Sequence, residues 1–407
     1  MQRRPLLAQR ILTGFLVLLP ALAGCGPADS PNPGTPVDEL LAPPPEGQGI
    51  QLSMKATIAP GVEGEWCQFV KAPAEALFVN RDEVRYTKGS HHFLLYETTY
   101  TEIPTKKENG TVVDTTGVFD CSDGATNGWS VTKLVGGSQN ADGTSIVRFP
   151  EGVAMPVKAG AVLLMNAHYV NATSEVLEPE VRINLHTIPE SEVKQEGDIL
   201  FMYNAFIHVP QMGSSRARMR CQVHKDITIQ NVQSHMHARG TGYEALEVGG
   251  TPFYTNEQWA DVPVKDFDGG LSLKAGTWID YACDYKNAEA RDVYQGPRST
   301  DEMCMLIGSY YPADPATAHC SLDVTKPLET GNLGAEWVGD GSATCAQTLG
   351  CIQQNFGPNF NLEGFTQCVT GSDPAVSREM SDVVQCIITS GNPMVDCKTQ
   401  IDACAAK

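Results

Sequence analysis

The sequence lacks any dense block of lysine and arginine, and no two of its cysteines form a Cys-x-x-Cys pair. Asp and Glu outnumber Lys and Arg by 48 to 29, which gives a formal net charge of −19 at pH 7. Because nucleic-acid binding depends on neutralising phosphates, this charge balance argues against a nucleic-acid partner. The missing Cys-x-x-Cys pair leaves cysteine-ligated zinc with little support.

Long apolar runs are scarce as well, and the one substantial run covers residues 11–23. It is too short for a comfortable transmembrane helix and is typical of a signal peptide. The run ends in LAGC, which resembles the bacterial lipobox, whose cysteine is lipidated. We expect residues 1–24 to be a lipoprotein signal peptide; the alternative is a plain secretory signal that ends at a cysteine. The expected location is the cell envelope, at the outer membrane or cell surface, with membrane attachment through lipidated Cys25 only.

Proline, glycine and acidic residues dominate residues 25–48, which predicts a flexible tether. Short apolar alternations separated by Gly and Pro then run to about residue 326, a pattern that predicts antiparallel β-sheet. A polar stretch near residues 194–198 divides this region. The predicted fold class is therefore mainly β, with two tandem antiparallel β-sandwich domains of jelly-roll-like type over residues 49–196 and 197–326.

The composition changes after residue 327, because six of the thirteen cysteines lie between residues 345 and 407. Asp-Pro at 373–374 and Asn-Pro at 392–393 each look like a helix N-cap followed by proline at the first helical position. Without Cys25 the chain has an even number of cysteines, and disulfides persist in exported proteins. We predict that residues 327–407 form a small helical module held by three disulfides, whose pairing stays open among fifteen possibilities.

Two histidine pairs are the first candidate metal ligands. His235 and His237 end an alternating run, and residues i and i+2 of a strand face the same side, so both imidazoles can meet one metal. The alternative is two histidines on a solvated strand face. His91 and His92 are direct neighbours, which reach one metal only if the strand bulges or if the rings use different nitrogens. Taken alone, this second pair is better explained as structural.

Two further residues gain meaning only from their order along the chain. His168 lies in an apolar strand-like run, where a single histidine is more often a core residue, and Met303 alone would be interpreted as core. The order is nevertheless His-His, His-Tyr, His-x-His and Asp-Glu-Met-Cys. The first two elements fall in the first predicted β domain and the last two in the second.

This order, and the stretches GSHHFLLYE, NAHYVN, SHMHARGTGY and STDEMCMLIGSYY, resemble the ascorbate-dependent type II copper monooxygenases. That family includes the peptidylglycine α-hydroxylating and dopamine β-hydroxylating enzymes, and the resemblance covers about residues 50–320. It implies an enzyme that hydroxylates an aliphatic C–H bond with O2 and a one-electron reductant such as ascorbate. The expected cofactors are two copper ions, and the expected partners are O2 and a small-molecule or peptide substrate.

The resemblance also implies a role for each ligand. The copper that stores and delivers an electron would be held by His91, His92 and His168. The copper at which O2 binds and the C–H bond is attacked would be held by His235, His237 and Met303, the expected catalytic set. A thioether is a soft ligand that favours Cu(I), and zinc is not expected to choose methionine.

The same resemblance implies three disulfides, namely Cys67 with Cys121, Cys221 with Cys320, and Cys283 with Cys304. The chain departs from the peptide-amidating enzymes at Gln233 and Ile307, where those enzymes hold a substrate carboxylate with Arg and Tyr, and Met305 replaces a polar Asn. A glycine-extended peptide is therefore not expected as the substrate. The alternatives to catalysis are a copper-sequestering surface lipoprotein and a β-sandwich adhesion module.

Overall fold

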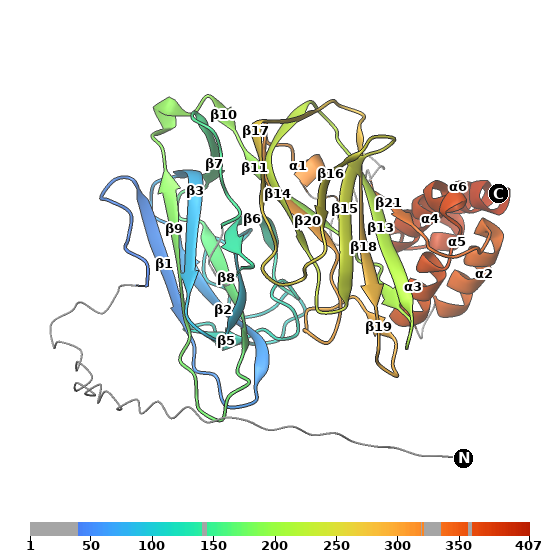
Figure 1. Cartoon of the computed structure of the whole chain (residues 1–407), viewed down its shortest axis with the longest axis horizontal. Helices are drawn as coiled ribbons and strands as arrows, with labels where there is room; N and C mark the ends of the chain where they lie inside the picture. Colours follow the sequence, from blue (N-terminus) through green and yellow to red (C-terminus); the bar gives the residue numbers. More distant parts are fainter. Residues whose placement is uncertain (1–39, 141–144, 319, 321–334, 357–359) are drawn as a thin grey trace, which may run out of the picture. The chain divides into compact units, whose positions relative to one another are not determined.

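The computed structural model describes residues 40–140, 145–318, 320, 335–356 and 360–407 (Figure 1). The predicted signal peptide, the lipidated Cys25 and most of the tether lie outside the described residues. Within the described ranges, the model contains no helix with the length and apolar character that a membrane crossing requires. The described part from Leu40 onward forms a single unit.

The first β region supplies two sheets, with strand orders β1-β9-β3-β7-β10 and β5-β2-β8-β4-β6. Neighbouring strands are antiparallel except for β7 and β10, which are parallel. The strands are β1 (Gly49–Lys55), β2 (Glu63–Lys71), β3 (Leu77–Tyr86), β4 (Ser90–Thr98), β5 (Phe119–Asp120), β6 (Val131–Ser138), β7 (Val153–Val157), β8 (Val162–Val170), β9 (Glu180–Thr187) and β10 (Gln195–Glu196).

The second β region begins with β11, directly after the polar stretch near residues 194–198. Its sheets have the orders β11-β20-β14-β17 and β16-β15-β18-β13-β21, with a small pair β12-β19. The strands are β11 (Asp198–Tyr203), β12 (His208–Val209), β13 (Ser214–Gln222), β14 (Ile227–His235), β15 (Gly240–Glu247), β16 (Pro252–Asn256), β17 (Lys265–Leu273), β18 (Trp278–Lys286), β19 (Val293–Tyr294), β20 (Met305–Tyr311) and β21 (Ala335–Val338). The sheet therefore extends past residue 326, because β21 pairs with β13.

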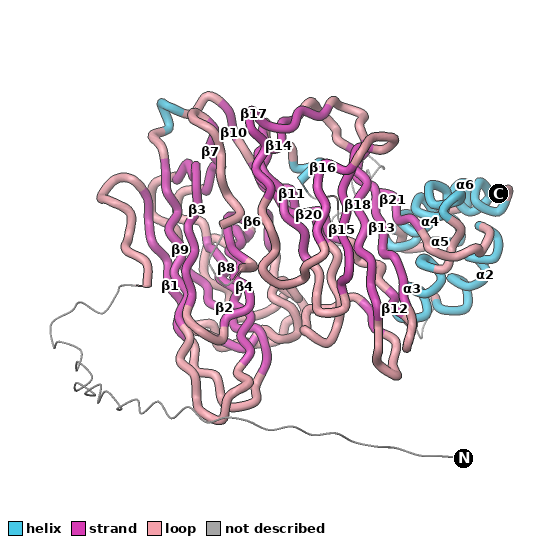
Figure 2. The backbone as a smooth tube through the Cα atoms, in the orientation of Figure 1, coloured by secondary structure: helices cyan, strands magenta, loops and turns pink. Residues whose placement is uncertain are grey.

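Helices gather at the C-terminal end of the chain, as Figure 2 shows in cyan. They are α2 (Cys345–Asn355), α3 (Leu362–Thr370), α4 (Ser377–Thr389), α5 (Pro393–Asp396) and α6 (Lys398–Ala405), while a short α1 (Pro315–Ala318) precedes β21. Asp373 caps only a short 3-10 helix, its side chain accepting from Ala375 N. Asn392 precedes Pro393 and α5 as expected but makes no capping hydrogen bond through its side chain.

Three disulfides hold this helical module, as predicted. They join Cys345 to Cys404, Cys351 to Cys368, and Cys386 to Cys397. The three other expected disulfides are also present, joining Cys67 to Cys121, Cys221 to Cys320, and Cys283 to Cys304. The mainly β fold class with a disulfide-held helical C-terminus is thus confirmed, whereas the jelly-roll-like sandwich arrangement stays a prediction.

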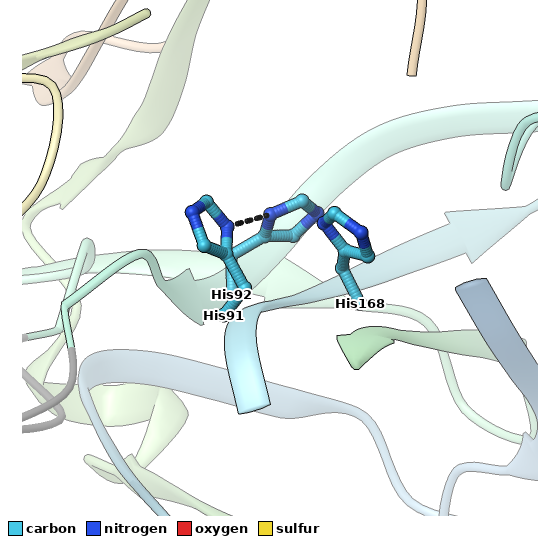
Figure 3. Close-up of side chains that lie close together, drawn as sticks. All are labelled: His91, His92 and His168. Atoms are coloured by element: carbon cyan, nitrogen blue, oxygen red, sulfur yellow. Dashed lines mark hydrogen bonds between the residues drawn. The ribbon is translucent and has the colours of Figure 1, made fainter. Parts of the chain in front are cut away.

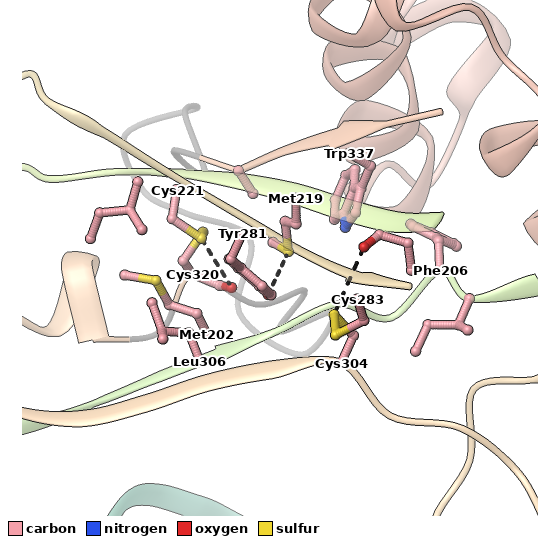
Figure 4. Close-up of a cluster of buried hydrophobic side chains, with 14 of the residues drawn as sticks. Met202, Phe206, Met219, Cys221, Tyr281, Cys283, Cys304, Leu306, Cys320 and Trp337 are labelled. Atoms are coloured by element: carbon pink, nitrogen blue, oxygen red, sulfur yellow. Dashed lines mark hydrogen bonds between the residues drawn. A yellow bond between two sulfur atoms is a disulfide. The ribbon is translucent and has the colours of Figure 1, made fainter. Parts of the chain in front are cut away.

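Two buried apolar clusters occupy the described residues. One fills the first β region, and Met305 and Ile307 of β20 belong to it, so the second region packs an apolar face against the first. The other runs from the second β region into the helices (Figure 4). There Phe206 lies edge-on to Trp337 of β21 with ring centroids 5.0 Å apart. The helical module therefore shares a core with the second region.

Candidate metal centre

The β2, β8 and β4 strands present a row of side chains toward the second region. The register pairs Glu65 with His168 and His168 with His92, and paired residues of antiparallel strands share a face. β8 is the central strand and is buried over eight of its nine residues, because both of its faces are covered. His168 shares its face of the sheet with Glu65 and His92, which explains how a polar ring is accommodated in an apolar run.

The second region presents a matching row from β11, β20 and β14. Here Tyr203 pairs with Met305, and Met305 pairs with His235. Side chains from both rows, His92 and His235 among them, line one cavity with a volume of about 1890 Å³. The imidazoles of His92 and His235 lie with ring centroids 5.8 Å apart. The two predicted metal sites are therefore adjacent across the contact between the β regions.

A bulge in β4 brings the two neighbouring histidines to the same side. The pairing with β8 shifts between Ser90, which faces Tyr169, and His92, which faces His168. His91 is the extra residue of this bulge. The Nδ1 atoms of His91 and His92 lie 3.3 Å apart (Figure 3). The bulge is thus one of the two conditions under which neighbouring histidines can both reach one metal.

The three histidines predicted for the first site converge. The His168 ring centroid lies 5.3 Å from that of His91 and 5.1 Å from that of His92. One candidate ligand atom from each residue lies within 4.8 Å of the others. His92 and His168 are buried, and His91 stacks at 6.1 Å against Trp259 of the second region. Three imidazole nitrogens at this spacing are a suitable donor set for one transition-metal ion.

Hydrogen bonds to the outer nitrogens show which ring atoms are free to bind a metal. His168 Nε2 lies 3.1 Å from Glu63 Oε1. Partial burial raises the pKa of Glu63, but hydrogen bonds from Ser299 and the adjacent His168 imidazole outweigh this and leave the pKa below its ordinary value. An ionised carboxylate can only accept, so Nε2 carries the proton. His168 Nδ1 is buried and has no hydrogen-bond partner among the described residues. Its lone pair is therefore free to bind a metal.

The second pair of histidines uses the opposite nitrogens. His235 Nδ1 donates to Gln139 Oε1 at 2.6 Å, and the Gln139 amide is oriented by its own bond from Nε2 to the Ser234 carbonyl. His237 Nδ1 donates to the Asp301 carbonyl oxygen at 3.1 Å. Nε2 is therefore the free nitrogen in both rings, and in His237 it is buried without a partner in the described structure. The two ring centroids lie 5.2 Å apart.

Burial keeps the five imidazoles uncharged. Desolvation lowers the pKa of each of them, to about 4 for His91 and His237. The repulsion that would arise between neighbouring protonated imidazoles lowers the pKa of His92 and His235 further. All five rings are therefore neutral near pH 7, the form in which imidazole binds a metal.

Met303 lies at the same end of the β14–β20 pair as His237. The last pair of the register is His235 with Met305, so one further step of two residues along each strand leads to His237 and Met303. Buried Glu302 ties the two chain segments together, because it accepts from the His237 backbone N–H at 3.0 Å. The Met303 carbonyl accepts from the Tyr285 hydroxyl at 2.7 Å, and Met303 lines the cavity together with His235.

Two of the three residues that depart from the peptide-amidating pattern, Met305 and Ile307, line the cavity. Gln233 pairs with Ile307 across β14 and β20, and Phe201 pairs with Ile307 from the other side. Met305 and Ile307 are each 4% exposed and line the cavity. Gln233 Oε1 is buried without a hydrogen-bond partner among the described residues. Met305 and Ile307 therefore make this part of the cavity apolar, and Gln233 is the strand neighbour of Ile307.

The sequence did not predict several residues that contact the candidate ligands or join the two regions. Glu63 and Gln139 hold ligand imidazoles, and the Asn140 side chain bonds the backbone of Val262 across the two regions. Nothing in the strand pattern distinguishes these residues from other polar positions at strand ends. Their role depends on which segment of the opposite region lies against them, which a single sequence does not reveal.

Comparisons with known proteins add little to this description. No protein-family model matches the chain, and no curated protein matches it. Similar solved structures include a mutant VP2 protein of infectious bursal disease virus in derived T=1 particles, at 8% identity and TM-score 0.15 over 67% of this chain and 71% of that chain. Infectious bursal virus derived T=1 particles give 8% identity and TM-score 0.14 over 69% and 77%. Similarity at this level carries no argument about fold or function.

Proposed function

We propose that the protein is a copper-dependent monooxygenase that hydroxylates an aliphatic C–H bond, using O2 and a one-electron reductant such as ascorbate. The observation that carries the proposal is the pair of adjacent donor sets at one cavity. One set offers three neutral imidazoles, and the other offers two neutral imidazoles, with Met303 lining the same cavity as His235. The sequence resemblance to type II copper monooxygenases names the same residues.

The residues present fit copper in both positions. His91, His92 and His168 would hold one ion, with Nδ1 as the donor atom of His168. His235 and His237 would hold the second through Nε2, with the thioether of Met303 completing the set. Two imidazoles and a soft, weak thioether favour Cu(I) over zinc and leave a coordination position open. Bound copper would supply single-electron transfer and the activation of O2.

The chain's own contribution is to orient these donors and to shape the cavity. Glu63, Gln139 and the Asp301 carbonyl each hold the outer nitrogen of one imidazole, so the inner nitrogen keeps its lone pair. Met305 and Ile307 give the cavity apolar walls next to His235, which exclude water from the region where a C–H bond would react. With Gln233 in place of a cation, the cavity favours a substrate without a carboxylate at this position.

The second candidate is a non-catalytic copper-binding lipoprotein of the cell surface. The three histidines of the first region favour it, because their close spacing would let them hold a metal ion without any ligand from the second region. Either function would be carried out in the cell envelope, given the expected signal peptide and lipidated Cys25. A copper-sequestering protein, however, has no use for an apolar cavity beside the second site.

Oxygen incorporation separates the two candidates. Protein loaded with two equivalents of copper and reduced by ascorbate is incubated under ¹⁸O2 with a panel of amphipathic and apolar small molecules and short peptides. A monooxygenase transfers one ¹⁸O atom into a product that mass spectrometry detects. Tight binding of copper with neither oxygen uptake nor labelled product across the panel would contradict catalysis and favour sequestration.

A further inference from the structure

The Glu63 carboxylate, at the start of β2, receives three hydrogen bonds from two parts of the protein. His168 Nε2 donates to Oε1 at 3.1 Å. The Ser299 backbone N–H donates to Oε1 at 3.0 Å, and the Ser299 hydroxyl donates to Oε2 at 2.8 Å. His168 belongs to the first β region, whereas Ser299 belongs to the second. One carboxylate therefore joins a ligand of the first site to the opposite region.

Ser299 belongs to a loop that also serves the second site. This loop, residues 295–303, connects β19 to β20 and is closed by bridge pairing of Gln295 with Glu302. Its Asp301 carbonyl accepts from His237 Nδ1, and it ends at Met303. Two of the three expected ligands of the second site thus depend on this loop. Glu63 is the residue of the first region that holds it through two hydrogen bonds from Ser299.

We propose that Glu63 is a positioning residue for both metal sites, an inference that rests on the proposed function. Toward the first site, Glu63 fixes the His168 ring in the form with the proton on Nε2, so that Nδ1 faces His91 and His92. Toward the second site, it holds the 295–303 loop in the place that presents Met303 to His235. Carboxylates that orient ligand histidines in this way commonly change metal affinity 10- to 100-fold.

A simple ion pair at the protein surface is the competing explanation. The Glu63 side chain is 31% exposed, and exposed ion pairs contribute little to stability. The two explanations differ in what they predict for the imidazole. If Glu63 forms only an ion pair, its removal does not change which nitrogen of the neutral His168 ring carries the proton. If Glu63 positions the ring, its removal does change which nitrogen carries the proton. The tautomer of His168 is therefore the quantity to measure.

The first experiment uses the complete, metal-free protein with ¹⁵N-labelled histidine. Long-range ¹H–¹⁵N NMR spectra at pH 7 should show His168 protonated at Nε2 in the wild type and in Glu63→Gln, which keeps an acceptor oxygen. Glu63→Ala should give a mixture of both tautomers. Glu75→Ala, which removes an exposed carboxylate from the loop after β2, is the control and should leave the spectrum unchanged. An unchanged His168 tautomer in folded Glu63→Ala would overturn the proposal.

The second experiment measures copper binding by competition with a chelator, and sulfur ligation by X-ray absorption of the Cu(I) protein. Glu63→Ala should weaken copper at the first site about 10- to 100-fold, with Glu63→Gln in between. Ser299→Ala, which touches no ligand itself, should reduce the copper–sulfur signal of Met303. An unchanged sulfur signal would overturn the link to the second site. If the wild type binds no copper, the proposed function fails, while the tautomer result still decides the role of Glu63.

Discussion

The two candidate sites are built in different ways, although they lie side by side. In the first, all three ligands come from β4 and β8, and the group that orients His168 belongs to the same region. In the second, the ligands come from the end of β14 and from a loop, and the group that orients His235 is Gln139 of the first region. The first site therefore takes its ligands and its orienting group from one region, whereas the second takes them from both.

The two sites should therefore differ in how strongly substitutions at other residues disturb them. A site set in the middle of a sheet is held by the strand register and by a neighbouring group of its own region, Glu63. A site formed by a strand end and a loop depends on the groups that position the loop, namely the Cys283–Cys304 disulfide, Glu302 and the opposite region. Variants that break each support in turn should separate the two sites.

The largest effect is expected for His168→Ala. The first site then keeps two imidazoles, which do not provide the three-nitrogen set, and one of two copper equivalents should be lost. Turnover should fall below detection, because the electron supplied through this site no longer arrives. Metal analysis after dialysis, together with oxygen uptake, tests this. Retention of both copper equivalents would show that His168 is a structural residue.

The next effect is expected when Cys283 and Cys304 are both replaced by serine. The disulfide closes a loop of 21 residues. Its loss should lower the free energy of unfolding by about 3 kcal/mol, and it should weaken copper at the second site because Met303 adjoins Cys304. The matched control removes Cys351–Cys368, with a separation of 17 residues in the helical module. That variant should lose similar stability in urea unfolding and keep its copper affinity. Equal copper affinity in the two double-serine variants would contradict the link between the Cys283–Cys304 disulfide and the second site.

Gln139→Ala tests the dependence of the second site on the first region. The His235 Nδ1–H loses its acceptor, so copper affinity at the second site should fall about 10- to 100-fold, while the first site should be unaffected. Site-resolved electron paramagnetic resonance of the Cu(II) protein follows both. Glu63→Ala, in contrast, should weaken copper at the first site, so the effect on the first site distinguishes the two variants. A change confined to the first site in Gln139→Ala would reverse the assignment.

The smallest effect concerns pH. Desolvation holds the pKa of His91 and His237 near 4, below the ordinary value of 6.5. A lowered pKa keeps imidazole neutral until the pH falls to that value, so protons should not compete with copper at the second site between pH 7 and 5.5. Copper affinity at that site, corrected for protonation of the chelator, should change by less than about twofold, against roughly tenfold for each ligand imidazole of ordinary pKa. A steep loss near pH 6.5 would mean that the rings are solvated.

The sequence predicted the β-rich class, the helical cysteine-rich end and the six candidate ligands, because these depend on local alternation and on residue order. It did not predict the bulge that turns His91, since a bulge depends on how β4 pairs with β8. It left the pairing of the last six cysteines open, because spacing alone does not choose among connectivities. It also missed Glu63 and Gln139, whose roles exist only once the two regions are in contact.

The most direct test of the account is oxygen uptake by the copper-loaded, ascorbate-reduced protein compared with Met303→Ile. The substitution removes the thioether and keeps an apolar side chain of similar size, so the fold should persist. We predict substrate-dependent oxygen uptake by the wild type, and none by Met303→Ile, which should still retain copper at His91, His92 and His168. Equal uptake by the two proteins would contradict the assignment of Met303 to the oxygen site, and with it the central claim.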